Sequence, residues 1–315
     1  MTQQYISIFR LFILALSVIF WYIIIIILCK RGNLTMNTKE LRVFAEEIRV
    51  ETLKEFMNLG FGHVGGSMSI VETLAVLYGK EMHIDPKNPQ MEDRDRLVIS
   101  KGHAGPALYA TLALKGYFPL EVLLTLNQGG TILPSHCDRL KTPGVDMTTG
   151  SLGQGMSTAC GIALGNKIKK SDKYTYLILG DGECNEGQVW EGAMFAAHQK
   201  LDNLIIFVDY NKLQLDGTTE DILNLGDMVD KFASFGCHTV KVNGHDIAAL
   251  EEAITNAKNT KGVPSVIVLD TIKGNGCPLC LSQFPNNHHL KFKPEDMVES
   301  VRLAEETLAK VKEEA

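Results

Sequence analysis

Apolar side chains recur three and four positions apart across residues 38–59, the spacing that places them on one face of a helix. Thr38 is the expected N-cap of that helix. Similar segments of ten or more residues predict further helices over 69–80, 105–115, 153–168, 188–201, 247–258 and 294–311. A helix with one apolar face must bury that face against a core, so these segments are expected to pack against a sheet or against one another.

Short runs rich in β-branched residues alternate with these helices, over 96–99, 174–179, 204–208, 238–242 and 265–270. The alternation indicates βαβ units and therefore an α/β fold, a mostly parallel sheet with helices on both faces. No internal repeat and no Pro/Gly/Ser linker divides residues 36–315, so they are predicted to form one domain. In such a sheet, ligands bind beyond the carboxyl ends of the strands.

The first 35 residues differ from the rest of the chain. Residues 11–29 form an uncharged run of 19, which as a helix would reach about 28 Å, close to the hydrocarbon thickness of a bilayer. Basic residues are more frequent after the run, which predicts a membrane anchor that leaves the C-terminal body of the chain in the cytoplasm. The alternative is that translation begins at Met36 and that this leader is an upstream artefact, while a cleaved secretory signal fits less well.

Composition narrows the class of protein. The chain has 315 residues, 45% hydrophobic and 22% charged, as in an ordinary globular protein. Its net charge of −6 argues against a nucleic-acid binder. The seven cysteines lack the spacing of a disulfide scaffold, so reduced thiols are expected. Cys277 and Cys280, followed by His288 and His289, resemble zinc ligands, but the absence of a second cysteine pair makes zinc the weaker interpretation.

Two predicted strands end in polar residues suited to a metal. The strand over 174–179 runs into Gly180-Asp181-Gly182, and the strand over 204–208 is followed closely by Asn211. If these strands are neighbours, Asp181 and Asn211 lie together at the sheet edge. One carboxylate, one amide oxygen and a backbone carbonyl are hard ligands that suit Mg²⁺ or Ca²⁺. The alternative is a simple turn at Asp181 and a helix cap at Asn211.

Four motifs resemble, in order, the signatures of transketolase. They are GHVGGS at 62–67, SKGHA at 100–104, TTGSLGQG at 148–155, and Gly180-Asp181-Gly182 with Asn211. The likeness runs across about 36–290 and is closest to the N-terminal subunit of a split transketolase. It implies the thiamine diphosphate-binding fold and the transfer of a two-carbon ketol unit between sugar phosphates.

The resemblance also implies roles for particular residues. Mg²⁺, with Ca²⁺ or Mn²⁺ as substitutes, would be held by Asp181, Asn211 and the main-chain carbonyl of Leu213. Thiamine diphosphate would be contacted by His103, Gly150, Leu152, Gly182 and Lys273. The catalytic set would be His63 and His288 beside the reacting carbon, His136 at the terminal hydroxyl of the donor, and Glu186 coupling paired active sites. Imidazole suits these tasks because it bonds hydroxyls, neutralises phosphate and moves protons near pH 7.

One departure and one omission limit the resemblance. Family members usually carry an aromatic residue before the last histidine, where this chain has Asn286-Asn287, so either His288 or His289 can take that role. The 42 residues after Lys273 are too few for the pyrimidine-binding domain of a transketolase. The chain is therefore expected to be inactive until a C-terminal partner subunit completes the site.

Two other functions stay open on the sequence alone. The first is a subunit of another two-component thiamine diphosphate enzyme, either a deoxy-ketose phosphate synthase or a 2-oxo acid dehydrogenase. The second is a membrane-tethered binding module that has lost catalysis, against which the intact Asp181, Asn211 and four histidines argue.

Overall fold

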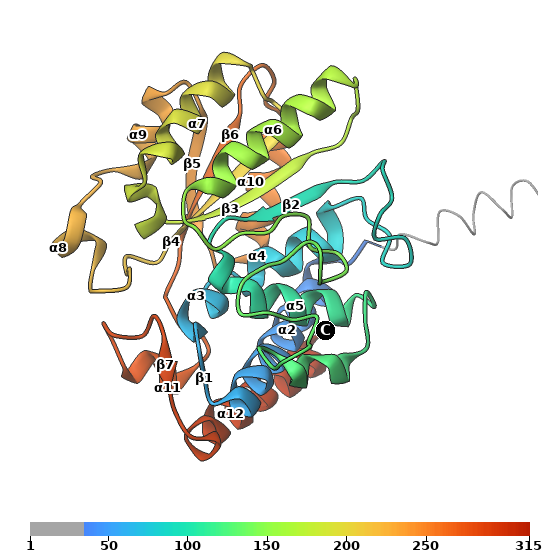
Figure 1. Ribbon diagram of the computed structural model, residues 1–315, viewed down its shortest axis with the longest axis vertical. Helices are drawn as coiled ribbons and strands as arrows, with labels where there is room; N and C mark the ends of the chain where they lie inside the picture. Colours follow the sequence, from blue (N-terminus) through green and yellow to red (C-terminus); the bar gives the residue numbers. More distant parts are fainter. Residues whose placement is uncertain (1–34) are drawn as a thin grey trace, which may run out of the picture. The chain divides into compact units, whose positions relative to one another are not determined.

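A five-stranded parallel sheet forms the centre of the molecule in a computed structural model that describes residues 35–315 (Figure 1). The strands follow the order β2 (Arg96–Ile99), β3 (Thr175–Gly180), β4 (Leu204–Tyr210), β6 (Ser265–Asp270) and β5 (His238–Asn243). All neighbouring pairs are parallel. The predicted α/β fold is therefore confirmed, and all five expected strands are present to within two residues at each end.

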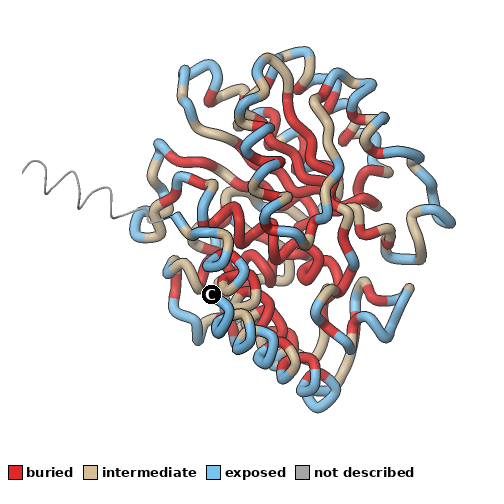
Figure 2. The backbone as a smooth tube through the Cα atoms, turned by 180° about the vertical axis from the view of Figure 1, so that it is seen from behind, coloured by how far each residue is buried: buried red, intermediate tan, exposed pale blue. Residues whose placement is uncertain are grey.

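Helices cover both faces of this sheet. One face packs against α6 (Gln154–Ile168), α7 (Gly187–His198) and α9 (Met228–Ser234), whose buried side chains meet alternate residues of the strands. The other face carries α10 (Ile247–Asn259), which lies beside α4 (Val71–Val76). Figure 2 shows the consequence, because β2, β3, β4 and β6 are almost continuously buried while the outer helix surfaces are exposed. Burial on both faces explains why these four strands are largely apolar runs, whereas the edge strand β5 is only partly buried and carries polar residues.

A further helical layer packs beside this sandwich. It contains α2 (Thr38–Leu59), α5 (Gly105–Leu114) and α12 (Pro294–Glu314), with α2 in contact with both of the others. The expectation that Thr38 caps α2 is wrong, because the side chain of Asn37 accepts from the backbone amides of Lys39 and Glu40 and forms a capping box. The helix ends at Gly60, whose φ of 81° is in the left-handed region that glycine adopts without strain.

A second, two-stranded antiparallel sheet is not predicted by the sequence pattern. It pairs β1 (Phe61–Gly62) with β7 (Leu290–Lys291), with Gly62 opposite Leu290. His63 directly follows β1, and His288 and His289 directly precede β7. This short ribbon therefore brings together histidines that are more than two hundred positions apart in the chain.

The remaining elements are short. The expected helix over 69–80 is replaced by α4 followed by a π-helical turn, Leu77–Glu81. Residues 64–68, over which no helix is predicted, are helical. The other short elements are α3 (Val64–Met68), α8 (Thr219–Leu223), α11 (Pro278–Ser282) and the 3₁₀ turns Gly102–Ala104, Leu120–Thr125 and Gly182–Asn185.

The leader over residues 1–35, with its uncharged run at 11–29, lies outside the described residues except for Thr35. Its interpretation as an anchor or as an upstream artefact therefore stays a prediction. Within the part of the chain that the structure describes, no helix has both the length and the apolar character needed to cross a bilayer.

Candidate active site

The carboxyl edge of the sheet brings the predicted metal ligands together. Strands β3 and β4 are neighbours, with Gly180 opposite Asp209, so Asp181 and Asn211 leave the sheet side by side. Both line a cavity of 180 Å³ together with Leu213. The expected adjacency of Asp181 and Asn211 is thus present in the structure.

A buried network of charge and hydrogen bonds fixes Asn211. Asp209 accepts hydrogen bonds from Lys101 Nζ (2.6 Å), Ser69 Oγ (2.6 Å), Asn211 Nδ2 (2.7 Å) and Thr271 Oγ1 (2.5 Å). Burial acts to raise the pKa of Asp209, but Lys101 and the hydrogen bonds hold that pKa below its usual value. We call Ser69, Lys101, Asp209, Asn211 and Thr271 the charge network. Because the amide nitrogen of Asn211 faces Asp209, its Oδ1 is turned the other way, toward the backbone amide of Leu213 (3.1 Å).

Asp181 is a buried carboxylate of a different kind. It is 3% exposed and accepts from two backbone amides, those of Gly182 (2.7 Å) and Lys212 (2.5 Å). Burial, together with the nearby charge of Asp209, raises its pKa to about 7. Among the described residues, no lysine, arginine or histidine forms an ion pair with it.

A hard divalent cation fits this environment. The cation would neutralise the buried carboxylate of Asp181 and could use the oriented Oδ1 of Asn211 and the carbonyl of Leu213 as further oxygen ligands. Glycine is required beside it, since a Cβ on Gly182 would come within 2.7 Å of Gln214 Cβ. Nowhere in residues 35–315 are three His, Cys, Asp or Glu side chains grouped to hold a metal, so an amide and a backbone oxygen would have to complete this set.

Lys273 places a buried amino group at the same cavity. Its Nζ donates to the carbonyl of Leu213 (3.0 Å) and lies 3.1 Å from His288 Nδ1. Burial lowers its pKa to about 8, against the opposing attraction of Asp181 and Asp209. A poorly solvated cation beside a metal site is suited to an anionic phosphate group.

Five histidine rings, which we call the histidine cluster, form one wall of the site. The ring centroid of His63 lies 5.2 Å from His103, 5.5 Å from His136, 5.2 Å from His288 and 4.8 Å from His289. Pairing of β1 with β7 positions three of these rings. The other two approach because the amide of Cys137 donates to the carbonyl of Gly102 (3.3 Å), which joins the segments carrying His136 and His103.

Four of the five rings are held in the neutral form. Burial, with the nearby charges of His289, His136 and Lys273, lowers the pKa of His63 to about 4. Burial and Lys273 lower the pKa of His288 to about 3, and burial also lowers the pKa of His103 and His136. Neutral imidazoles can each donate one hydrogen bond and accept another at pH 7.

The predicted cofactor contacts are distributed unevenly around the cavity. Its lining contains the predicted residues His103, Leu152, Gly182, Lys273 and His288. His63 and His136 do not line the cavity. The ring of His136 packs against that of His63, which in turn packs against His103 and His288 in the lining. Gly150 packs against His136, because a Cβ there would lie 3.3 Å from His136 Cδ2.

Two further candidate residues that do not line this cavity are exposed. Glu186 is exposed at the N-cap of α7, and His289 is exposed with its ring packed against His63. Of the two adjacent histidines, His288 is therefore the one that meets both the cavity and Lys273.

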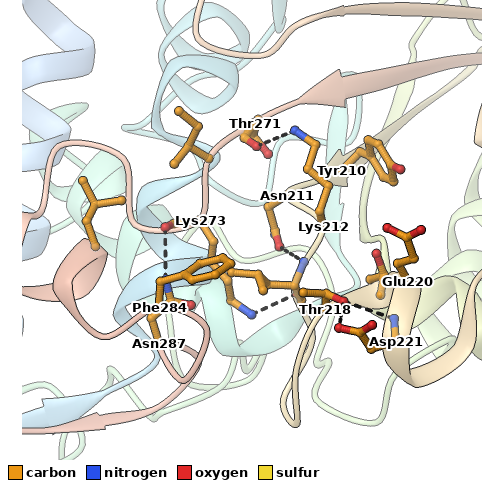
Figure 3. A pocket seen from close by; sticks show the side chains of 14 residues that line it. Tyr210, Asn211, Lys212, Thr218, Glu220, Asp221, Thr271, Lys273, Phe284 and Asn287 are labelled. Atoms are coloured by element: carbon orange, nitrogen blue, oxygen red, sulfur yellow. Dashed lines mark hydrogen bonds between the residues drawn. The ribbon is translucent and has the colours of Figure 1, made fainter.

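A larger cavity of 640 Å³ adjoins the first and shares Asn211, Leu213 and Lys273 with it. In Figure 3, Lys273, Phe284 and Asn287 lie on one side of it, and Tyr210, Glu220 and Asp221 on the other. Asn287, which directly precedes His288, is one of the residues that line the larger cavity. Its Nδ2 donates to the carbonyl of Lys273 (3.3 Å), while its buried Oδ1 has no hydrogen-bond partner among the described residues.

The cysteine pair packs in the hydrophobic core beside α12. Both thiols are free and buried, with Cys277 Sγ 3.7 Å from Ser300 Oγ and Cys280 Sγ 3.7 Å from the carbonyl of Asn287. His288, which the zinc interpretation would need, is instead bonded to Lys273.

Sequence reasoning missed three buried charged residues at this site. It predicts neither the pairing of Lys101 with Asp209 nor any role for Glu183. The available signal is Asp209 itself, which belongs inside strand β4 and is fully buried, although the strand is expected to end at Val208. A carboxylate inside an apolar strand needs a buried partner.

Comparison with known proteins identifies the family. Residues 41–303 match the family model described as "Transketolase, thiamine diphosphate binding domain". The chain belongs to the transketolase family. It is 53% identical over 251 residues to the 6-deoxy-6-sulfo-D-fructose transketolase subunit of Clostridium sp. (strain MSTE9), an alignment that covers 80% of this chain and 91% of the relative. The predicted resemblance and enzyme class, a transketolase, are therefore confirmed.

Other members of the transketolase family show how much of an enzyme the chain represents. An apulose-4-phosphate transketolase subunit of Phocaeicola vulgatus is 35% identical, with 89% of this chain and 99% of the relative covered. The solved transketolase of Leishmania mexicana superposes with a TM-score of 0.75 at 28% identity, covering 89% of this chain and 46% of that protein. The Campylobacter jejuni transketolase gives a TM-score of 0.75 at 27% identity, covering 88% of this chain and 48% of that protein. The chain thus spans about half the length of these solved transketolases.

Proposed function

We propose that this chain is the diphosphate-binding subunit of a two-subunit transketolase and becomes active only with a C-terminal partner subunit. Two observations support this. Two relatives that match it nearly end to end carry the word "subunit" in their names, with 91% and 99% of their lengths covered. The solved transketolases are about twice as long. We assign this function to residues 36–315. Because the six described cysteines are free, we also propose that these residues lie in the cytoplasm.

The cavity at the carboxyl edge is the proposed cofactor site. Asp181, Asn211 and the carbonyl of Leu213 would hold Mg²⁺, for which Ca²⁺ or Mn²⁺ could substitute. Thiamine diphosphate would lie against His103, Gly150, Leu152, Gly182 and Lys273. The observation that carries this proposal is a buried carboxylate without an ion-pair partner among residues 35–315, beside an oriented amide oxygen and a buried amino group, in one cavity of 180 Å³.

Bound thiamine diphosphate supplies the carbon nucleophile and the electron sink for cleaving a ketose C–C bond. The residues of this chain orient the sugar and move protons. Because Lys273 Nζ donates to His288 Nδ1, the ring proton of His288 is on Nε2, which makes this histidine a donor toward a sugar oxygen. Neutral His63 would accept a hydroxyl proton as the bond breaks and return it to the acceptor. His136 would hold the terminal hydroxyl of the donor, and Glu186 would couple paired sites.

We propose that the donor is a ketose with an anionic group on its far carbon. The names of two relatives support this class, since one acts on 6-deoxy-6-sulfo-D-fructose and another on apulose 4-phosphate. A sulfonate and a phosphate are both tetrahedral anions that neutral and cationic donors can bind. Sugar phosphates and sugar sulfonates should therefore both be assayed.

The test is a ketol-transfer assay with this chain by itself, with the C-terminal partner subunit by itself, and with the two mixed. We expect turnover only in the mixture, only with thiamine diphosphate and Mg²⁺, together with formation of a larger complex in size-exclusion chromatography. A positioned acid or base is typically worth 10²–10⁴-fold, so loss of the partner's groups should leave little activity. Substantial turnover by the purified chain alone would refute the two-subunit proposal.

A further inference from the structure

Glu183 is a buried acid that has no role in the proposed chemistry. It lies in the 3₁₀ turn after Asp181-Gly182 and is 2% exposed. Within residues 35–315 it forms no ion pair. Its carboxylate accepts three hydrogen bonds, from Ser100 Oγ, from the amide of Gly153 (2.7 Å) and from the amide of Gly180 (3.0 Å).

Each of the three donors belongs to a different loop of the proposed cofactor site or to the end of the strand that leads into it, since Gly180 is the last residue of β3. Ser100 precedes Lys101 in the loop that carries His103. Gly153 ends the loop that carries Gly150 and Leu152, and Gly180 precedes Asp181. One side chain therefore joins all three loops, which lie up to 83 positions apart in the sequence.

The joint uses both oxygens of Glu183 as acceptors: Oε1 accepts from Ser100 and Gly153, and Oε2 accepts from Gly180. Burial raises the pKa of Glu183, while the hydrogen bonds and the charge of Lys101 act in the opposite direction. The negative charge also lies at the N-terminus of α6, a helix of 15 residues that begins next to Gly153 and whose dipole favours an anion there. Ser100 extends the connection, because its Oγ accepts from the amide of Gly155 (3.1 Å) in the first turn of that helix.

The backbone around the joint leaves little room for movement. Gly153 has a φ of 84°, a left-handed conformation, and a Cβ on it would lie 2.9 Å from Glu186 Cβ. A Cβ on Gly155 would overlap Ser100. The loops are therefore already in close contact, and the hydrogen bonds of the carboxylate fix their positions relative to one another.

We propose that Glu183 is a positioning residue that holds the three loops in register and thereby sets the affinity of the site for the Mg²⁺ complex of thiamine diphosphate. This inference rests on the proposed function for its ligand. Glu183 acts through the loops, because both of its oxygens are occupied by protein donors.

Two variants at Glu183 remove different numbers of these hydrogen bonds. Glu183→Gln keeps the size and can keep two of the three bonds, but its amide faces another donor at one position. Glu183→Ala removes all three. We expect the dissociation constant for Mg²⁺–thiamine diphosphate, measured by calorimetry on the complex with the partner subunit, to rise about tenfold for Gln and about a hundredfold for Ala. Glu252→Gln, an exposed acid on α10, is the matched control and should leave it unchanged.

A second readout uses the full chain without cofactor. Hydrogen exchange should accelerate in the three loops and at the start of α6, while β4 and β6 keep their protection.

A third readout is the steady-state kinetics of the complex with the partner subunit. The apparent KM for thiamine diphosphate should rise while kcat at saturating cofactor stays within about twofold, since the loops can be re-ordered by bound ligand. A merely structural role would accelerate exchange throughout the sheet and leave cofactor affinity of the folded protein unchanged.

Either of two results overturns the proposal: wild-type affinity in Glu183→Gln and Glu183→Ala, or exchange that rises evenly across the sheet. If Glu183→Ala does not fold, the isosteric Gln variant carries the test alone. If the wild-type complex binds no Mg²⁺–thiamine diphosphate, the proposed function fails, and the exchange pattern still decides whether Glu183 fixes the loops.

Discussion

The two sides of the candidate active site use their polar atoms differently. In the charge network, Asp209 accepts four hydrogen bonds, and Lys101 donates to the carbonyl of Gly66 (2.7 Å) as well as to Asp209. In the histidine cluster, the structure of residues 35–315 gives the five rings a single hydrogen bond, between His288 and Lys273. The charge network is buried and its hydrogen bonds are complete, whereas the histidine rings are partly buried or exposed and most of their ring nitrogens have no partner among residues 35–315.

This difference separates structure from function. A buried charge is tolerated when protein partners compensate it, and removing one partner is then costly for folding. Polar atoms left without protein partners in a cavity are available to a ligand. We therefore expect changes in the charge network to lower stability, and changes in the histidine cluster to lower activity at nearly constant stability.

The largest expected effect is on the stability of the charge network. Asp209→Ala leaves Lys101 buried and unpaired, and should lower the free energy of unfolding by about 3–5 kcal/mol, measured by urea denaturation. The matched control is Lys169→Ala, which removes an exposed ion pair with Glu92 and should cost less than about 1 kcal/mol. Equal losses in the two variants would contradict the distinction.

A second aspartate sharpens the comparison, since Asp181 is as buried as Asp209 but has no ion-pair partner among the described residues. Asp181→Asn should therefore leave the free energy of unfolding within about 1 kcal/mol of wild type. The affinity for Mg²⁺–thiamine diphosphate should fall at least about a hundredfold, because the only acidic ligand proposed for the metal is lost. Calorimetric titration of the complex checks this, and wild-type affinity would remove Asp181 from the metal site.

The sequence predicted the part of the site that depends on neighbouring strands. Asp181 and Asn211 follow consecutive strands of a parallel sheet, and consecutive strands are adjacent in most folds, so their proximity could be expected. The motifs around His63, His103 and Gly150 lie in segments that the structure brings close together. These predictions used short-range pattern and chain order alone.

The sequence did not predict contacts that depend on tertiary packing. Ser69 and Lys101 lie 140 and 108 positions from Asp209, and no periodicity connects them. Strands β1 and β7 have two residues each, too few to show alternation, so no pattern indicates the ribbon that joins His63 to His288. Glu183 gives no signal of burial, because a single acid in a turn is usually exposed.

A third prediction concerns the histidine cluster itself. His63→Asn should lower kcat/KM for ketol transfer by about a hundredfold, at the lower end of the range for a general acid or base. The free energy of unfolding should change by less than about 1 kcal/mol, because the structure records no hydrogen bond from this ring among residues 35–315. Activity is measured on the complex and stability by urea denaturation. A large loss of stability with proportionate loss of activity would place His63 in the structural class with Asp209.

The smallest expected effect is the pH dependence that the cluster adds to stability. Burial lowers the pKa of His63 from its usual 6.5 to about 4 in the folded chain, so between these values the unfolded chain binds more protons than the folded one. Its contribution to stability is therefore present above pH 6.5 and is lost as the pH falls toward 4. As the pH falls from 6.5 toward 4, we expect the unfolding free energy of the wild type to decrease relative to that of His63→Asn. NMR titration of the ring protons provides the direct check: a midpoint near 6.5 for His63 would mean that the ring is solvated and easily charged, and the contrast with the compensated charge network would no longer hold.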